Sequence, residues 1–359
     1  YFNFKKFFFQ NGYGENESHL IASLISFLTL FFSKNGMEIS FAVFFFSLSL
    51  LYLYKNILIF CLLSFLTFLS RLEFLIFYFL ILTNELFLNK KILNIEYLFK
   101  LLLLPLLVIF YILINLYYYD IPFPESGIAK SLVNNVKFNK ETFTFLSSNG
   151  YGMKFISIMF YFNCLGIFFL FSKKLKNFTK ISLLTTLLFF ISNSLRSAWP
   201  LWTWHFFFLG ISSSVLLNDL INLFTLRFKK YSASIIGIFF VSIYLFLFIK
   251  NFNINNDHIL NIAEKIEKHY SETSYETYAM GDMAGKVSYL LDKKLIQLEG
   301  LVGGKKILRK IQNQDNLCNL FNEFNVDIYL TTKIKQVGDI YYIEEPSQES
   351  SNVKKMKGK

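Results

Sequence analysis

The chain has 359 residues, of which 54% are hydrophobic and 19% aromatic, and its mean hydropathy is +0.42. This exceeds the apolar surface that a soluble domain can bury and indicates a polytopic membrane protein. The net charge of +11 lies wholly in residues 1–250, which contain 21 Lys/Arg and 10 Asp/Glu. Residues 251–359 contain 15 Lys/Arg and 15 Asp/Glu, so they lack the basic face that nucleic-acid binding needs.

Three ionisable residues, Glu15, Glu17 and His19, precede the first apolar segment at about 20–33. Carboxylates at the mouth of a membrane helix are costly unless they face a polar cavity or a partner, so Glu17 and Glu15 are candidate catalytic acids and His19 a candidate binding residue. The alternative is a purely structural role, in which the same acids stabilise the helix N-terminus through the helix dipole. Glu17 and His19 also suit a divalent cation, although two ligands are too few to define a metal site.

Eight further apolar segments follow, several of them shorter than the ~20 residues that cross a bilayer upright. They lie at about 38–54, 56–70, 74–88, 97–117, 155–172, 180–194, 205–223 and 231–249. Basic residues near 90, 173–180 and 227–230 mark cytoplasmic loops, which places 118–154, 195–204 and the residues after 250 outside. Because Lys34, Lys55 and Arg71 cannot all be cytoplasmic under simple alternation, we expect Glu17 outside and residues 56–88 to form one broken or re-entrant unit.

The break between two of these segments, SRLEF, contains Arg71 and Glu73. A guanidinium fixed in such a break suits a phosphate oxygen. The alternative is a structural ion pair that closes a helical kink.

Two predicted external loops add further candidates. YYYDIPFPESGIAK, residues 117–130, is an ordinary external loop by composition. RSAWPLWTWHF, residues 196–206, contains all three tryptophans beside Arg196 and His205. An aromatic belt at the membrane surface explains most of this, but a Trp face such as that of Trp202 also stacks on sugars, and an outward Arg could meet a lipid phosphate.

Residues 251–345 are expected to form a small α/β domain on the external side. Strands are predicted in YETYAMGD, LIQLEG, VDIYLTT and IYYIEE, with helices at 258–270, 282–291 and 304–324. This alternation predicts a partly parallel sheet. Residues 346–359 are polar and expected to be disordered.

In their order along the chain, these motifs resemble the polytopic C-type glycosyltransferases that use polyprenyl-phosphate sugars, related to bacterial protein mannosyltransferases and arabinofuranosyltransferases. Glu17 matches the acid that opens a membrane helix in that family. Arg71 and Glu73 match its Leu-Thr-Arg-Pro-acid signature, with Leu72 in place of Pro. The loop and external signatures match Pro124, Ser126, Lys130, Gly281, Asp282, Gly285, Tyr289, Glu299, Gly300 and Leu301.

The resemblance implies a membrane all-α polytopic helical bundle with a small C-terminal extracytoplasmic α/β domain, in the bacterial inner membrane. It implies transfer of a hexosyl or pentosyl group, with inversion, from a polyprenyl-phosphate donor to a hydroxyl of a glycan, lipid or protein. Glu17 and Glu15 would be catalytic, and the substrate and lipid phosphate would be held by His19, Arg71, Glu73, Ser126, Lys130, Arg196, Trp202 and His205. No cofactor is implied, and a divalent cation is left open.

The family's main catalytic Asp lies in the first external loop after the first membrane helix, and we expect that loop and helix to precede Tyr1. A transporter or lipid flippase is the main alternative, since acids and Arg71 could also serve a substrate pathway. A noncatalytic envelope scaffold is a second. The transferase interpretation requires Glu17, Arg71 and the tryptophan-rich turn to converge on one external pocket.

Overall fold

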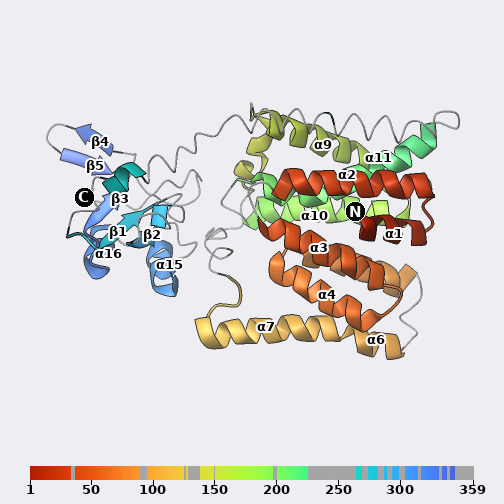
Figure 1. Ribbon diagram of the computed structural model, residues 1–359, viewed down its shortest axis with the longest axis horizontal. Helices are drawn as coiled ribbons and strands as arrows, with labels where there is room; N and C mark the ends of the chain where they lie inside the picture. The colour runs from red at the N-terminus through yellow and green to blue at the C-terminus, as the bar shows by residue number, and fades with distance from the viewer. Residues whose placement is uncertain are drawn as a thin grey trace. The chain divides into compact units, whose positions relative to one another are not determined.

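The computed structural model describes residues 1–33, 37–88, 95–124, 127, 138–148, 150–196, 200–224, 242, 264–268, 274–281, 287–288, 293–298, 304–313, 317–330, 334–337 and 340–343. The chain divides into two compact units. The first comprises Tyr1–Tyr111, Thr142–Asn193 and Leu201–Lys250, and the second Ile112–Glu141, Ser194–Pro200 and Asn251–Lys359. The described part is mostly helical, with a small parallel sheet (Figure 1).

Three described helices are long and apolar enough to cross a membrane: Ile95–Tyr119, Asn177–Leu195 and Thr203–Asn222. In chain order the helices are α1 (Phe2–Gln10), α2 (Glu15–Ser33), α3 (Met37–Tyr52), α4 (Ile57–Ser70), α5 (Phe74–Thr83), the π-helix η1 (Asn84–Leu88), α6 (Ile95–Leu101), α7 (Leu103–Tyr119), the 3₁₀ helix η3 (Lys140–Leu146), α9 (Tyr151–Phe168), α10 (Asn177–Arg196), the 3₁₀ helix η4 (Thr203–Phe206) and α11 (Phe207–Phe224). Apart from α1 and η3, which were not expected, their positions agree with the apolar segments expected up to residue 223. The segment expected at 231–249 lies outside the described residues except for position 242.

Side-chain contacts fix the directions of the helices in the first unit. α11 runs antiparallel to α2, because Gly210, early in α11, packs against Leu28 and Phe32, late in α2. It also runs antiparallel to α10, because Thr179 contacts Asp219 whereas Thr186, further along α10, contacts Ser212.

The break predicted at SRLEF is present, and the chain reverses there, as in the re-entrant alternative. α4 ends at Ser70 and α5 begins at Phe74. The Glu85 carboxylate in η1 then accepts a hydrogen bond of 2.9 Å from the hydroxyl of Tyr54, which precedes α4. α4 and the α5–η1 segment are therefore two helical segments running in opposite directions.

The helices have two ends, which we name by their charged residues. The Glu17 end comprises residues 12–17, 52–56 and 173–176, and the Arg71 end comprises Glu38, residues 71–73 and residues 202–205 (Figure 1). With a rise of 1.5 Å per residue, α2 separates Glu17 from Phe32 by roughly 22 Å.

Phenylalanine side chains fill much of the core of the first unit. Phe46 of α3 is fully buried and lies with its ring centroid 4.8 Å from that of Phe77 and 6.3 Å from that of Phe207. Buried polar side chains also join helices, as in the hydrogen bond of 2.6 Å from Asn163 of α9 to Ser213 of α11. Such interhelical hydrogen bonds are typical of helices packed in an apolar solvent.

The second unit contains the parallel sheet expected from the tail. Strands β1 (Thr277–Met280), β2 (Lys294–Gln297) and β3 (Ile328–Leu330) pair in the order β2-β1-β3, all parallel. The predicted helix at 304–324 is present as two helices, α15 (Gly304–Gln312) and α16 (Leu317–Glu323). An antiparallel hairpin follows, of β4 (Ile334–Val337) and β5 (Ile340–Ile343), and of these only β5 was expected. The tail 346–359 lies outside the described residues.

Candidate functional site

Glu17 lies in the first turn of α2 and is tied to a loop far away in the sequence. Its carboxylate lies 3.2 Å from the Lys176 ammonium and accepts a hydrogen bond of 3.3 Å from the backbone N–H of Gly14. The Lys176 ammonium also donates to the carbonyl of Gly12 and lies 3.4 Å from the centre of the Tyr13 ring. Glu17 thus holds the start of α2 against the start of α10.

Glu15 and His19 lie one turn apart on the surface of α2. The Glu15 carboxylate lies 3.8 Å from His19 Nε2 and 3.6 Å from the Lys5 ammonium. His19 Nδ1 also forms a hydrogen bond with the hydroxyl of Tyr1. These contacts join α1 to α2.

A buried acid at the same end was missed in the sequence. Asp219 of α11 is 3% exposed and accepts hydrogen bonds of 2.7 Å from the Thr179 hydroxyl and 3.0 Å from the backbone N–H of Lys176. The signal was available, since Asp219 is an acid within the apolar segment 205–223. It caps the start of α10.

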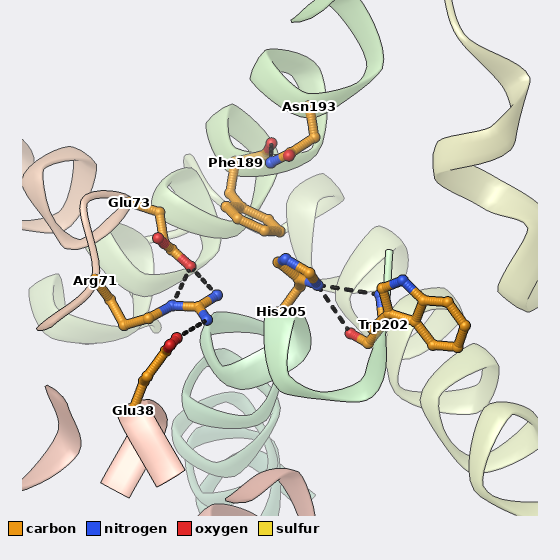
Figure 2. Close-up of polar contacts among 7 residues, drawn as sticks. All are labelled: Glu38, Arg71, Glu73, Phe189, Asn193, Trp202 and His205. Carbon is orange, nitrogen blue, oxygen red and sulfur yellow. Dashed lines mark hydrogen bonds and ion pairs between the residues drawn. The ribbon is translucent and has the colours of Figure 1, made fainter. Parts of the chain in front are cut away.

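The second cluster forms around Arg71 at the opposite end (Figure 2). The Arg71 side chain is only 9% exposed, and its Nε donates a hydrogen bond of 2.8 Å to Glu73 Oε1, to which Nη2 also donates. Nη1 faces a different carboxylate, at 3.6 Å from Glu38 Oε2. Glu38, in the first turn of α3, was also missed, although an acid at the mouth of an apolar segment is the pattern that singled out Glu17.

The charges of this cluster keep Glu73 ionised. Burial disfavours the carboxylate, but the guanidinium of Arg71 and then the imidazole of His205 favour it, and together they hold the pKa of Glu73 below its ordinary value. Glu73 is therefore a permanent anionic partner of Arg71 at neutral pH.

His205 is oriented by the turn that contains it. The backbone N–H of Trp202 donates a hydrogen bond of 3.0 Å to His205 Nδ1, which also lies 3.3 Å from the carbonyl oxygen of Trp202. In the neutral tautomer that accepts this N–H, the ring carries its proton on Nε2. Figure 2 shows this second nitrogen turned toward the side of Phe189 and Glu73. The ring can therefore present an N–H donor beside the Arg71 cluster.

The same turn presents an aromatic surface. The rings of Trp202 and Trp204 are stacked, with centroids 5.8 Å apart and planes 10° from parallel. Trp202 is 46% exposed. Its free area is of the kind on which the C–H face of a sugar can stack.

The expectation of a single pocket is wrong. Arg71, Glu73, Trp202 and His205 lie together, whereas Glu17, Glu15 and His19 lie at the other end of the helices. The physical reason is the reversal of the chain at Arg71. Because of this reversal, successive apolar segments alternate in direction, and Glu17 lies at the end that carries Lys55 and Lys176. Glu17 thus lies at the same end as residues 173–180, the loop that the sequence predicts to be cytoplasmic.

The remaining predicted residues cannot be placed. Ser126 and Lys130 lie outside the described residues, and so does the side chain of Arg196, the last residue of α10. Within the described part of the chain, no group of three or more His, Cys, Asp or Glu residues could hold a metal ion. Comparison with protein-family models, with curated proteins and with solved structures found no match to this chain.

Proposed function

We propose that the chain is an integral membrane glycosyltransferase, which transfers a sugar from a polyprenyl-phosphate donor to an acceptor hydroxyl at the Arg71 end. The observation that carries this proposal is the Arg71 cluster itself. It combines a guanidinium held by a half-buried carboxylate, an oriented imidazole and an exposed indole face at one end of a group of apolar helices. A guanidinium suits a phosphate, and an exposed aromatic face suits the C–H surface of a sugar.

The distribution of lysines supports an extracytoplasmic position for this cluster. Lys55, Lys173 and Lys174 lie at the Glu17 end, and Lys5 pairs with Glu15 there. The other end has Arg71 between two carboxylates and one lysine of α9, Lys154, whose helix begins near Phe31. By the positive-inside rule the Glu17 end faces the cytoplasm and the Arg71 end faces outward. In this topology the described helices form a polytopic bundle in a plasma membrane.

The proposed chemistry breaks the bond between the sugar C1 and the donor phosphate oxygen. The acceptor oxygen attacks C1 and loses its proton to a carboxylate, while the phosphate leaves with the bonding electron pair. Arg71 and the Nε2–H of His205 stabilise the charge that grows on this phosphate. Glu73 holds Arg71 in place, and Trp202 supports the sugar.

Glu17 and Glu15 have no part in this site, because they lie at the other end of α2. The resemblance assigns the proton-accepting carboxylate to an Asp in the family's first external loop.

A transporter or flippase is the second candidate, and two buried acids within helices favour it. Glu85 and Asp219 are 0% and 3% exposed, and buried ionisable residues mark many ion pathways. Each, however, accepts a hydrogen bond that joins two helical segments, from Tyr54 and Thr179 respectively. A structural role accounts for both.

The test is a transfer assay in membranes that contain the full-length protein and a radiolabelled polyprenyl-phosphate sugar. Arg71→Gln should reduce transfer about 100-fold, the usual loss when a donor to a developing oxyanion is removed. Glu17→Gln, which removes a charge at the other end, should retain most of the activity. Equal transfer by the wild type and Arg71→Gln would reject the site, and absence of transfer with every lipid sugar tried would favour the transporter.

A further inference from the structure

The two carboxylates beside Arg71 are held very differently. Glu73 accepts hydrogen bonds from both Nε and Nη2, and its side chain is 24% exposed. Glu38 lies 3.6 Å from Nη1, beyond hydrogen-bond distance, and its side chain is 75% exposed. Glu73 is thus a fixed partner of the guanidinium, whereas Glu38 is a loosely held one.

Glu38 also takes the only charge-compensating position that faces solvent among the described groups around Arg71. With Glu38 and Glu73 ionised, the three residues carry a net charge of about −1 at neutral pH, which repels an incoming anion. Exposed ion pairs are weak, whereas a phosphate forms charge-assisted, often bidentate hydrogen bonds with a guanidinium. A phosphate can therefore replace Glu38 but not Glu73.

We propose that Glu38 occupies the anion position of Arg71 and must be displaced by the phosphate of the ligand, so that it selects for phosphorylated ligands. This inference rests on the proposed function and adds a specificity-determining residue to it. Selectivity follows because a neutral headgroup cannot compete for the guanidinium and leaves the Glu38 pair intact. Discrimination by a competing or repulsive contact is a general route to specificity.

Equilibrium binding to the purified full-length protein in detergent tests the proposal with three probes: farnesyl phosphate, inorganic phosphate and farnesol. Glu38→Gln keeps the shape of the side chain and removes its charge. It should bind farnesyl phosphate about two- to fivefold tighter than the wild type, the effect expected from loss of one exposed ion pair. The affinity for farnesol should not change.

The matched control is Glu96→Gln, which removes the charge of another exposed acid in the first turn of a helix, paired with Lys100. It should leave all three affinities unchanged. Inorganic phosphate distinguishes the source of the anion: a site for a lipid headgroup binds farnesyl phosphate more tightly than inorganic phosphate, and a site for free phosphate binds both alike. Glu38→Gln should strengthen whichever of the two is bound.

Two other outcomes separate the inference from the proposed function. Unchanged or weaker binding of farnesyl phosphate by Glu38→Gln overturns the role of Glu38, while the anion site stands if Arg71→Gln abolishes binding. Binding of farnesyl phosphate by Arg71→Gln as tight as in the wild type, or no binding by any variant, overturns both. The melting temperature of each variant shows whether it is folded.

Discussion

Arg71 illustrates how an ionisable residue is accommodated between two apolar helices. Its side chain is nearly buried, and a buried charge is tolerated only when it is paired and hydrogen-bonded. Glu73, two residues away, supplies that pair from the same turn. A structural ion pair and a fixed anion-binding group are therefore compatible roles for the same side chain.

The lowered pKa of Glu73 makes a prediction about stability in acid. A carboxylate whose folded-state pKa is below its unfolded value contributes stability at pH values above the unfolded value of about 4.5, and this contribution is lost as the pH falls through the lower folded-state pKa. Glu73→Gln should thus lower the melting temperature at pH 7 and reduce its dependence on pH below about 4.5. If the melting temperatures of the variant and the wild type fell by the same amount from pH 7 to pH 3, this role of Glu73 would be contradicted.

Helix packing in the first unit depends on close approach at particular positions. A Cβ at Gly210 of α11 would lie 2.8 Å from Phe32 Cε2 and 3.3 Å from Leu28 Cδ1 of α2. A larger side chain would have to push the two helices apart or move Phe32 from its buried position. This contact also fixes α2 and α11 as antiparallel neighbours, on which the separation of the two charged ends depends.

We predict that Gly210→Val destabilises the protein by about 1–3 kcal/mol, the usual cost of overpacking a well-packed core. Thermal or denaturant unfolding in detergent measures this change. Gly14→Val is a suitable control, because the nearest atom to a Cβ at Gly14 is 3.7 Å away, in the Glu17 side chain. Combining Gly210→Val with Phe32→Ala should cost less than the sum of the two single changes, since the second removes the atom that clashes. Strict additivity would exclude the α2–α11 contact.

At the scale of the whole molecule, the charged residues sort the helix ends into two kinds. One end carries several exposed lysines together with Glu17, and the other carries Arg71 between two acids and, at the start of α9, Lys154. Such an asymmetry is what the positive-inside rule produces in a membrane protein whose helices alternate in direction. The proposed site lies at the end with fewer lysines.

The sequence predicted the elements better than their directions. The apolar segments, the break at SRLEF and the parallel strands could be predicted because they depend on local composition and periodicity. Whether the chain continues or reverses at SRLEF could not be decided from the sequence, because this depends on tertiary contacts such as those of Tyr54 with Glu85 and of Thr67 with Tyr78. The same holds for the partner of Glu17, Lys176, which lies 159 positions away along the chain.

The members of the Arg71 cluster, except Glu38, could also be predicted. Arg71, Glu73, Trp202 and His205 were identified by their residue types beside apolar segments. That they lie together depends on how the helices pack, since residues 71 and 205 come from turns far apart in the sequence. Grouping them with Glu17 was wrong because a charged residue at a helix end does not reveal which face of the membrane it occupies.

The most direct test of the account is the sidedness of the two ends. After replacement of Cys61, Cys164 and Cys318 by Ser, single cysteines are introduced as Lys55→Cys and Lys174→Cys at the Glu17 end and Glu38→Cys and Trp202→Cys at the Arg71 end, all at exposed positions. Intact cells are then treated with a membrane-impermeant maleimide. We predict that Glu38→Cys and Trp202→Cys react in intact cells and that Lys55→Cys and Lys174→Cys react only after permeabilisation. Reaction of Lys174→Cys and Glu38→Cys from the same side would contradict the account.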